Sequence, residues 1–399
     1  MPTIKASVSC PIHDSFRVQQ VAGMFGLPVA ELATERFEVD VPGAEESWQI
    51  GLIVGPSGSG KTTIACRAFG ERLYAGAAWP SSRAVVDSFG SLSIRQVLEL
   101  FTAVGFSSPP SWLKPYGVLS GGERFRCDLA RALAIGLTAP GSAGGRPGKP
   151  PAEPGAIVVF DEFTSVVDRT VAKVCSAAIA KGIRRGSIPC RFVAVTCHYD
   201  VADWLEPDWV VDMARCELVR RTPGEAGGCF RRPAIQLEIH RSDVAAWELF
   251  KRHHYLSGTL PRGARCYLTT WEGVPVNFCA TVPLVAKKNH RRFARIVTLP
   301  DFQGIGIGMR AVSAIAELHR AEGHRVSVTS SHPALVRHCE RSPLWRLVGI
   351  RKWDQPRRSA LFSTYRATGR TVVSFEYRGE RSEVGGRRSD KNFVLTPET

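Results

Sequence analysis

The distribution of apolar and polar residues divides the chain into two parts with different orders of elements. In the first part, short apolar runs alternate with helical patterns. The runs have the length of buried strands and cover residues 48–54, 156–160 and 192–196. The helical patterns cover residues 62–73 and 124–137. Alternating buried strands and helices indicate an α/β domain with a largely parallel sheet.

The second part has a different order, β-α-β-β-β-α-β-α, which is typical of a mixed α/β domain. Its expected strands cover residues 235–240, 264–271, 274–282, 293–299 and 325–329. Its expected helices cover residues 243–253, 308–322 and 333–341.

Two stretches interrupt these patterns. Residues 139–155 contain five Gly and five Pro, so they can hold neither a helix nor a central strand. Motifs of one domain flank them, which indicates an insertion inside that domain. Residues 223–233 are the better domain boundary, so we expect a first domain at 1–222 and a second at 234–378. Residues 379–399 form a basic polar tail whose composition is typical of poorly ordered segments.

Charge differs between the two parts as sharply as the pattern does. The chain has 399 residues, 44% of them apolar and 22% charged, which is ordinary for a globular protein. Its formal net charge is +15. Residues 1–250 hold 26 basic and 26 acidic residues, whereas residues 251–399 hold 26 basic and 11 acidic ones. The second part therefore carries the whole excess, which makes a polyanionic partner plausible there.

Cysteine usage and hydropathy predict a cytoplasmic protein. The 11 cysteines include no CxxC pair, so neither a zinc ribbon nor a thioredoxin-type motif is indicated. Scattered single cysteines are typical of reduced, mostly buried thiols. The N-terminus lacks the apolar region of a signal peptide, and no run of about 18 apolar residues predicts a membrane segment.

A phosphate-binding loop follows the first expected strand. The sequence GPSGSGKTT fits GxxxxGK[ST] and opens an expected helix. Its glycines let backbone N–H groups and the helix N-terminus face an anion. Lys61 adds a charge for the β- and γ-phosphates, and the Thr62 hydroxyl is placed to hold Mg²⁺. The expected ATP-binding residues here are Gly55, Pro56, Ser57, Gly58, Ser59, Gly60, Lys61, Thr62 and Thr63; a chance Gly-rich turn is the alternative.

Two carboxylates end the apolar run that follows the insertion. Asp161 and Glu162 directly follow four apolar residues. A buried parallel strand delivers its last side chains to the edge of the sheet where α/β proteins bind ligands. We expect Asp161 to complete the Mg²⁺ shell and Glu162 to polarise an attacking water as general base.

The segment Leu119-Ser-Gly-Gly-Glu123 completes a recognisable set. It resembles the LSGGQ signature of the ABC-type ATPases, with Glu123 in place of Gln. The resemblance gives Ser120, Gly121, Gly122 and Glu123 a role in ATP binding. Asp168 then matches the D-loop and His198 the switch histidine, which adds His198 to Glu162 as a catalytic candidate. In this family the signature meets the ATP of another protomer, so one module per chain implies an ATP-bridged homodimer.

The chain departs from that family in two respects. Lys61 and Ser120 are only 59 residues apart, which indicates a reduced helical insert. No clear Q-loop glutamine is found; Gln96 is the nearest candidate and Asp87 the alternative. Phe16 and Trp48 are both considered for stacking on adenine. The absent membrane part and the Glu variant favour a soluble ABC ATPase over a transporter subunit, with a separate membrane partner as the alternative.

A second Gly-rich turn lies between a strand and a long helix of the second part. The sequence QGIGIG, from Gln303 to Gly308, fits a simple turn or a dinucleotide fingerprint, but no βαβ unit and no acidic residue follow. It resembles the Q/R-x-x-G-x-G/A motif of the GNAT acyltransferases, whose turn holds the pyrophosphate of coenzyme A. The resemblance implies acetyl-CoA or another acyl-CoA as cofactor, or else a degenerate GNAT fold that binds none. The expected CoA-binding residues are Val297, Thr298, Gln303, Gly304, Ile305, Gly306, Ile307 and Gly308.

The acyl-transfer residues are harder to assign. The strand before the turn has no carboxylate, and the usual Tyr of the later helix is missing, with Trp345 and His338 nearby. The best candidates are His253, His254 and Tyr255 together with Ser257, because a histidine near pKa 6.5 transfers protons at neutral pH. His332 is a second candidate. The alternative is a capped helix end with exposed histidines.

The stretch HHYLSGTLP on a basic GNAT-like core also resembles the Mom-type DNA-modifying acyltransferases of phages. The whole chain, over about residues 10–370, resembles a fusion of an ABC ATPase with a GNAT-like domain. Three groups of basic residues are candidates for phosphate contacts. They are Arg291, Arg292 and Arg295; Arg351, Lys352, Arg357 and Arg358 with Trp353; and Arg387 with Arg388.

These features predict an ATP-driven acyltransferase that modifies DNA or RNA. One alternative is an ATP-regulated acetyltransferase for a protein or a small amine. Another is a non-catalytic ABC-type clamp on nucleic acid. The surplus of positive charge beyond what one CoA molecule requires favours the nucleic-acid substrate.

Overall fold

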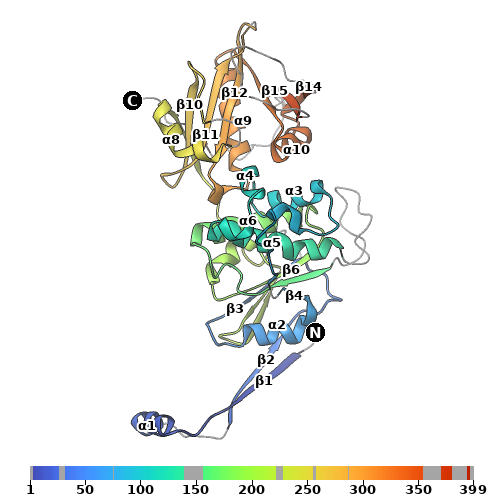
Figure 1. Ribbon diagram of the computed structural model, residues 1–399, viewed down its shortest axis with the longest axis vertical. Helices are drawn as coiled ribbons and strands as arrows, with labels where there is room; N and C mark the ends of the chain where they lie inside the picture. The colour runs from blue at the N-terminus through green and yellow to red at the C-terminus, as the bar shows by residue number, and fades with distance from the viewer. Residues whose placement is uncertain are drawn as a thin grey trace. The chain divides into compact units, whose positions relative to one another are not determined.

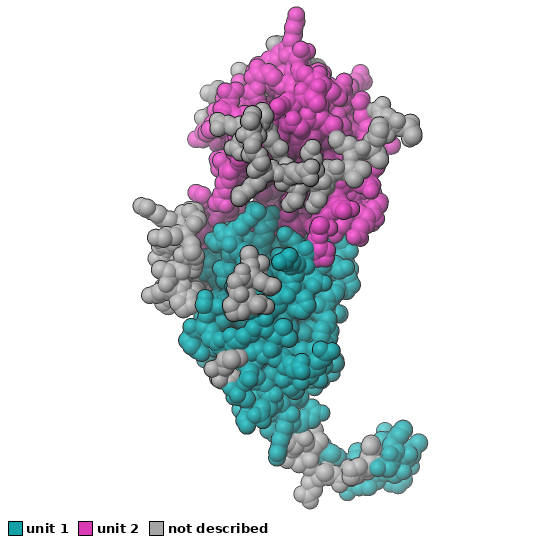
Figure 2. Space-filling model, turned by 180° about the vertical axis from the view of Figure 1, so that it is seen from behind, with its two compact units in different colours: residues 1–78, 128–232 teal, residues 79–127, 233–399 magenta. Residues whose placement is uncertain are grey.

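The computed structural model describes residues 3–26, 32–74, 76–138, 156–221, 228–254, 258–285, 287–353, 370–379 and 393–395. The chain forms two compact units (Figure 2). Unit 1 comprises residues 1–78 and 128–232, and unit 2 comprises residues 79–127 and 233–399. The predicted insertion at 139–155 lies outside the described residues. The sequence gives no sign that residues 79–127 group with the C-terminal part.

A six-stranded sheet with the order β4-β5-β6-β3-β7-β8 forms the centre of unit 1. Its strands are parallel except β8, which pairs antiparallel with β7. Burial on both faces explains why β3, β5 and β6 consist of continuous apolar runs. The strands are β3 (Ile50–Val54), β4 (Leu73–Tyr74), β5 (Ile157–Phe160), β6 (Arg191–Thr196), β7 (Trp209–Asp212) and β8 (Glu217–Arg220).

The helices of unit 1 begin and end where local chemistry dictates. Asp168 caps α6 by accepting the N–H of Val171. Helix α2 ends at Phe69 because Gly70 adopts φ +56°, so it is shorter than the expected 62–73. The helices are α2 (Lys61–Phe69), α6 (Arg169–Arg184) and α7 (Ala202–Leu205), with 3-10 turns η1 (Gly70–Arg72) and η4 (Tyr199–Val201). Helix α5 (Gly121–Thr138) begins in unit 2 and continues into unit 1.

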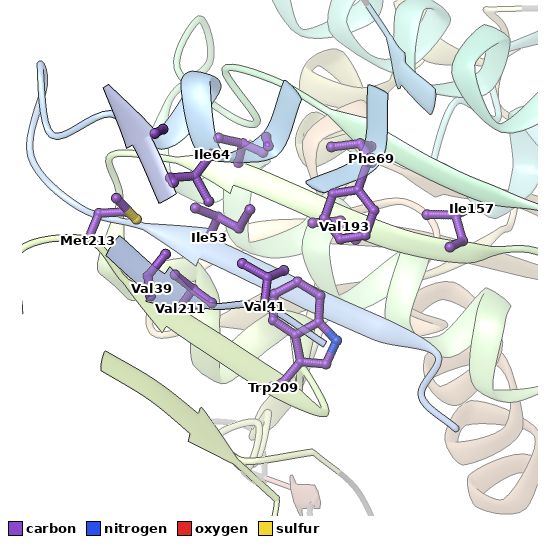
Figure 3. Close-up of a cluster of buried hydrophobic side chains, with 14 of the residues drawn as sticks. Val39, Val41, Ile53, Ile64, Phe69, Ile157, Val193, Trp209, Val211 and Met213 are labelled. Carbon is purple, nitrogen blue, oxygen red and sulfur yellow. The ribbon is translucent and has the colours of Figure 1, made fainter. Parts of the chain in front are cut away.

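Trp209 anchors the core of unit 1, where it lies among aliphatic side chains of the strands (Figure 3). A Cβ atom on Gly51 would come within 2.1 Å of the indole ring, so only glycine leaves room for it. Trp209 stacks on Phe69 and meets Trp48 edge to face, with ring centroids 6.4 and 5.4 Å apart. Trp48 is only 7% exposed. Its indole is a core group, which argues against the adenine-stacking role considered for it.

An antiparallel hairpin extends from unit 1 and carries a short helix at its far end (Figure 1). Strands β1 (Thr3–Pro11) and β2 (Leu32–Asp40) pair from Thr3↔Asp40 to Pro11↔Leu32. Helix α1 (Phe16–Phe25) is capped by Ser15 and ends at Gly26 in the left-handed conformation. Phe16 is 77% exposed on this helix.

Residues 79–127 of unit 2 fold into short helices around an aromatic cluster. The cluster joins Phe101 to Phe89, Phe106 and Trp112, with ring centroids 5.1 to 5.8 Å apart. Ser93 and Gln96 form a capping box at the start of α3, so the Gln96 amide is occupied by a structural role. The elements are η2 (Val85–Ser88), α3 (Ile94–Ala103), α4 (Pro109–Trp112), η3 (Tyr116–Val118) and the first turns of α5.

An eight-stranded sheet with the order β14-β15-β13-β12-β11-β10-β9-β16 forms the rest of unit 2. The pairs β12–β13 and β9–β16 are parallel and the others antiparallel. The strands are β9 (Leu237–Ser242), β10 (Arg265–Trp271), β11 (Val274–Pro283), β12 (His290–Thr298), β13 (Arg325–Ser330), β14 (Trp345–Trp353), β15 (Arg370–Tyr377) and β16 (Phe393–Leu395).

Helices cover both faces of this sheet. Successive side chains of β11 point to opposite faces, so Cys279 packs under α9 (Ile307–Ala321) and Phe278 packs under α8 (Trp247–Phe250). Helix α10 (Pro333–Arg341) covers the expected range of residues. The expected helix at 243–253 occurs as α8 between two 3-10 turns, η5 (Val244–Ala246) and η6 (Lys251–His253), and η7 (Pro300–Phe302) precedes α9.

The predicted fold class is confirmed: a mainly parallel sheet with helices in unit 1 and a mixed sheet with helices in unit 2. Within the described ranges, no helix is both long and apolar enough to span a bilayer.

His319 makes the stability of unit 2 depend on pH. Its Nε2 atom lies 2.9 Å from Thr281 Oγ1 and 3.2 Å from the Tyr267 hydroxyl, and its Nδ1 atom lies 3.2 Å from Glu322. Burial lowers the pKa of His319 to about 4. The unfolded chain therefore binds the proton first as the pH falls from about 6.5 to 4, and stability is lost in that window, by at most about 3 kcal/mol.

We expect hydrogen exchange of α9 to show this loss in urea at pH 5 relative to pH 7. His319→Gln should flatten the pH dependence. The exposed His338→Gln should leave it unchanged. An equally steep profile in the His319→Gln protein would contradict the assignment.

Candidate functional site

The three strongest motifs of unit 1 lie at one edge of its sheet. Strand β6 lies between β3 and β5, in register with Val54↔Thr196 and Phe160↔Ala194. Because these strands are parallel, their carboxyl ends meet at the same edge. The loop after β3 begins with Gly55, Asp161 and Glu162 follow β5, and His198 follows β6. The sequence-predicted residues of this group therefore share one edge of the sheet.

The loop after β3 has the backbone that its glycines allow. Gly58 and Gly60 adopt φ +81° and +79°, which side chains disfavour. A Cβ on Gly60 would also lie 2.8 Å from the ring of Phe37. Lys61 is 9% exposed, and its Nζ donates to the Pro56 carbonyl over 2.6 Å. Its ammonium group is thus held inside the loop, where a phosphate would replace the carbonyl as partner.

Glu162 has a strained backbone that its neighbours hold in place. Its φ is +51°, and Thr164 has φ +68°, both in the left-handed region. The Ser165 hydroxyl donates to Glu162 Oε2 over 2.6 Å, and the N–H of Phe163 donates to the Val195 carbonyl over 2.8 Å. Non-glycine residues in this conformation cost about 1–3 kcal/mol and cluster at functional sites. The strain sets Glu162 apart from an ordinary surface glutamate.

Asp168 and His198 also have structural partners. Asp168 Oδ1 accepts the N–H of Val171 over 2.9 Å as the cap of α6. His198 is partly buried, and its backbone N–H donates to Thr196 Oγ1 over 3.2 Å. A capping role alone therefore accounts for Asp168, whereas the edge position after β6 gives His198 access to a ligand at this edge.

The signature-like segment forms a capping box at the start of α5. Glu123 Oε2 accepts the N–H of Ser120 over 3.0 Å, and Ser120 Oγ accepts the N–H of Glu123 over 3.3 Å. The Ser111 hydroxyl donates to Glu123 Oε1 over 2.7 Å. Burial alone would raise the pKa of Glu123, but the hydrogen bonds from Ser111 and Ser120 outweigh it and the pKa is lowered. Ser120 and Gly121 remain exposed at the helix N-terminus, where backbone N–H groups favour an anion.

A β-bulge opens the sheet of unit 2. The register between β11 and β12 shifts from Ala280↔Arg295 to Thr281↔Phe293, which leaves Ala294 as the extra residue. A bulge bends its strand. The parallel ladder between β12 and β13 ends at Phe293↔Val328, although both strands continue. The two strands therefore do not pair with each other beyond this point. We call this interruption of the ladder the cleft, and its backbone amide groups suit an extended ligand that carries amide groups.

The turn after β12 closes one end of this cleft. Gly304 and Gly306 adopt φ +95° and +100°, a conformation that glycine permits at no steric cost. A Cβ on Gly308 would lie 2.6 Å from Thr298 Oγ1, so α9 starts in close contact with β12. Val297 and Ile307 are 5% and 3% exposed. Their side chains belong to the core, which leaves their backbone groups for a ligand; Ile305 is partly buried.

Gln303 makes contacts that the sequence does not predict. Its Nε2 donates to the Thr298 carbonyl over 2.9 Å, and its Oε1 accepts the N–H of Ser107 over 2.9 Å. Within unit 2, residues 105–107 therefore lie directly against the turn. A Cβ on Gly105 would come within 2.7 Å of the Gln303 carbonyl oxygen. No local motif signals these contacts, because nearly two hundred residues separate the partners along the chain.

The predicted acyl-transfer histidines have different surroundings. Arg252 Nε donates to His253 Nε2 over 3.0 Å. Burial and the Arg252 charge lower the pKa of His253, whereas the carboxylates of Asp301 and Glu123 act in the opposite direction. His254 packs against Trp247 with ring centroids 5.7 Å apart. Tyr255 and Ser257 lie outside the described residues. His253 is thus neutral near pH 7, as a proton acceptor must be.

His332 lies at the same end of the cleft, directly before α10, because β12 and β13 run parallel. Its Nε2 is 3.3 Å from the Ser107 carbonyl, and its ring lies 6.4 Å from that of Trp112. Burial lowers the pKa of His332. Trp345 and His338 lie near the position where GNAT enzymes usually have a tyrosine. Trp345 belongs to the core and His338 is exposed.

The basic candidates divide into internal and exposed groups. Arg291 is 7% exposed and donates to Thr281 Oγ1 over 3.2 Å, so its charge serves the interior rather than a partner. Arg295 donates to the Thr259 carbonyl over 2.6 Å. Arg292, Arg351 and Lys352 are exposed. Arg357, Arg358, Arg387 and Arg388 lie outside the described residues, and the side chain of Trp353 is not described.

Comparison with known proteins gives matches at the level of structure. No family model and no curated protein sequence matches the chain. Among solved structures, the chain is similar to the ribosomal-protein-S18-alanine N-acetyltransferase from Escherichia coli. The identity is 13% over 38% of this chain and 99% of that one, with a TM-score of 0.29.

Two further solved structures are each similar to less than half of the chain. A GNAT family acetyltransferase from Elizabethkingia anophelis with acetyl-CoA bound is 11% identical over 36% of this chain and 97% of its own, with a TM-score of 0.28. The dimeric structure of MJ0796, a bacterial ABC transporter cassette, is 17% identical over 47% of this chain and 88% of its own, with a TM-score of 0.32. The structures that the chain resembles thus include both kinds of protein that its motifs resemble.

The capping box predicts the effect of a change at Glu123. Gln at this position keeps both capping hydrogen bonds, so α5 should retain its stability. It removes a negative charge from a helix end that is otherwise suited to anions. We expect Glu123→Gln to tighten ATP-dependent self-association several-fold, as measured by analytical ultracentrifugation. Glu123→Ala, which lacks the capping group, should instead destabilise the helix by about 1 kcal/mol. Weaker association of the Glu123→Gln protein would contradict this reading of the signature.

Proposed function

We propose that the chain is an ATP-hydrolysing ATPase of the ABC type joined to an acyl-CoA-dependent acyltransferase of the GNAT type. We further propose that it works as an ATP-bridged homodimer and that its acceptor is a base in DNA or RNA. The observation that carries the first half is the common edge shared by the loop after β3, Glu162 and His198. The cleft between β12 and β13 carries the second half.

The ATPase part of the proposal is supported by the charge and geometry at the edge of the unit 1 sheet. The positive-φ glycines let backbone N–H groups surround a phosphate, and the buried Lys61 exchanges its carbonyl partner for it. The Thr62 hydroxyl and the Asp161 carboxylate are oxygen donors of the kind that Mg²⁺ takes together with phosphate oxygens and water. When bound, the ion would neutralise charge on the phosphates. Glu162 then orients and deprotonates the attacking water, and His198 contacts the γ-phosphate.

The proposed dimer is supported by the exposure of the signature-like segment at the start of α5. Ser120 and Gly121 present a helix N-terminus to solvent, and such an end attracts phosphate. The family resemblance places this end against the ATP of a second copy. The dimeric form of the ABC cassette that the chain resembles agrees with this arrangement.

The acyl-transfer half uses the cleft and the turn beside it. The pyrophosphate of acyl-CoA would bind the N–H groups of residues 304–308 at the start of α9. The amide-bearing arm would lie along the separated strands. His253 is neutral at pH 7, so it takes the proton from the acceptor amine as the amine nitrogen attacks the thioester carbonyl carbon. A C–N bond forms and the C–S bond breaks. The released thiolate takes up a proton from solvent or a neighbouring acid.

The proposal of a nucleic-acid acceptor rests on the charge of residues 251–399. Residues 251–399 carry the entire +15, far more than one CoA molecule requires. The loop between β11 and β12 presents the exposed Lys287 and Lys288, and Arg292 is exposed on β12. Exposed cations of this kind bind phosphates without regard to sequence. The first test of the substrate class is mass spectrometry of nucleosides from cells that do or do not express active protein.

Two substitutions test the ATPase assignment. Lys61→Ala should abolish ATP binding, because the only buried cation of the loop is removed. Glu162→Gln should bind ATP but not hydrolyse it, and it should therefore accumulate as a dimer. Light scattering with and without ATP distinguishes the two, with Lys173→Ala on α6 as a control that should behave as wild type. A Glu162→Gln protein that stays monomeric in ATP would contradict the composite site.

Salt titration tests the nucleic-acid partner. The double substitution Lys287→Ala, Lys288→Ala should weaken binding to a labelled oligonucleotide. It should also reduce the slope of log K against log salt by about 1 to 2, because about one phosphate contact is lost per lysine. Arg215→Ala, an exposed cation of unit 1, is the matched control and should change neither quantity. Absence of salt-dependent binding in the wild-type protein would exclude nucleic acid and favour a protein or small amine as acceptor.

A further inference from the structure

One residue of the helical segment 79–127 bridges the two strands that flank the proposed acyl-CoA cleft. The backbone N–H of Ser107 donates to Gln303 Oε1 over 2.9 Å. The carbonyl of the same residue accepts from His332 Nε2 over 3.3 Å. Gln303 lies in the turn after β12, and His332 directly follows β13. Ser107 therefore spans the ends of the two strands that separate beyond Phe293↔Val328.

The bridge formed by Ser107 lies where a ligand bound in the cleft would pass. Gln303 lies just before α9 and His332 just before α10, so the bridge joins the N-terminal ends of both helices. A phosphate at the turn would lie beside α9. An extended chain that leaves the cleft must pass between the two strand ends. Backbone at Ser107 occupies that route in the present structure.

Further contacts hold this segment against the cleft. Trp112 lies over His332, and Glu99 of α3 forms an ion pair with Arg337 of α10. Arg126 Nη2 lies 3.7 Å from Asp301 Oδ1, just before the turn. The Arg126 side chain is 1% exposed, and its Nε and Nη2 atoms have no hydrogen-bond partner among the described residues. Docking against the turn thus leaves a buried guanidinium poorly satisfied, which makes this arrangement costly to maintain.

The same segment connects to the signature. Ser111 and Trp112 belong to α4, and Ser111 donates to Glu123 Oε1 over 2.7 Å. Trp112 Nε1 donates to the Phe106 carbonyl over 2.9 Å, so α4 and the bridge form one packed element. A path of contacts therefore runs from Glu123 through Ser111 and Trp112 to Phe106, which precedes Ser107.

We propose that residues 105–112 are a plug that closes the acyl-CoA cleft, and that ATP binding across the homodimer withdraws it through the signature. The inference rests on the proposed function and names the regulation of its acyl-transfer site. Partner-bound ATP engages Ser120 and the first N–H groups of α5, which competes with the hydrogen bonds that hold Glu123. Acyl-CoA and the plug exclude each other, so ATP and acyl-CoA favour the same open state. By linkage, each ligand raises the affinity of the dimer for the other by the same factor.

Acetyl-CoA titration of the full-length Glu162→Gln protein by calorimetry tests the coupling. We expect acetyl-CoA to bind about tenfold more tightly with ATP than without nucleotide, in the usual range of coupling between sites. Hydrogen exchange of residues 104–112 gives a readout that does not depend on acetyl-CoA. The Ser107 amide should exchange faster when ATP is bound.

A glycine pair supplies a matched test of the plug. Gly105 has φ +79°, and a Cβ there would meet the Gln303 carbonyl oxygen at 2.7 Å. Gly90 of the same segment has φ +59°, and a Cβ there would meet nothing within 4 Å. Both Ala substitutions strain the backbone, but only Gly105→Ala pushes the plug from the turn. We expect Gly105→Ala to bind acetyl-CoA about tenfold more tightly without nucleotide and to lose most of the ATP effect, with Gly90→Ala like wild type.

Variants of the ion pairs of Glu99 provide a second test if the Gly105→Ala protein folds poorly. Glu99 pairs both with Arg95 within α3 and with Arg337 on α10. Arg337→Ala should loosen the plug and tighten nucleotide-free acetyl-CoA binding. Arg95→Ala leaves the inter-helix pair intact and should not. The swap of Glu99→Arg with Arg337→Glu should restore wild-type behaviour.

The outcomes separate the two proposals. If acetyl-CoA binds equally with and without ATP, and Gly105→Ala equals Gly90→Ala, the plug is wrong while the acyltransferase assignment stands. If no variant binds acetyl-CoA in any nucleotide state, the acyltransferase assignment fails and the plug has nothing to close. Unchanged exchange at Ser107 in ATP would also overturn the coupling.

Discussion

The bulge at Ala294 is the constraint on which the organisation of unit 2 depends. The extra residue in β12 directly follows Phe293, where the pairing of β12 with β13 ends after four residue pairs. It also reverses the alternation of side chains, so that both Phe293 and Ile296 face the core under α9. The turn at Gly304 and the bridge at Ser107 lie where these two strands no longer pair.

The first turn of helix α5 contacts the segment that packs beside this cleft. Its first turn contains Ser120 and Glu123, whose mutual hydrogen bonds serve the helix as an ordinary capping box. The same Glu123 accepts from Ser111, which belongs to the segment packed on the cleft. One short stretch of sequence therefore satisfies a local requirement of the backbone and at the same time holds α4 in place. The pKa of Glu123 is lowered by these contacts, so the carboxylate stays charged and keeps its role as acceptor.

Local chemistry determined most of what the sequence could predict. Helix α10 was predictable because Pro333 fixes its start, and β5 was predictable because four apolar residues end in two carboxylates. The loop after β3 needed only its glycines and Lys61. The bulge gave no signal, since Ala294 fits either register. The burial of Trp48 could not be predicted because it depends on Trp209, far away in the chain. The Ser107 bridge depends on partners that no local pattern can connect. The assigned roles of the site residues remain predictions.

The composition of unit 2 from two distant segments has a consequence for biosynthesis. Residues 79–127 leave the ribosome long before residues 233–341, which supply the turn, His332 and Arg337. At about 5–20 residues per second, the wait is on the order of 10 to 40 s. During that time Trp112 and the buried face around Gly105 lack their final cover, while strands β5 to β8 of unit 1 are synthesised. The last stretch of the chain thus finishes the folding of one of the first, and a nascent chain that stalls after unit 1 exposes the surface that chaperones recognise.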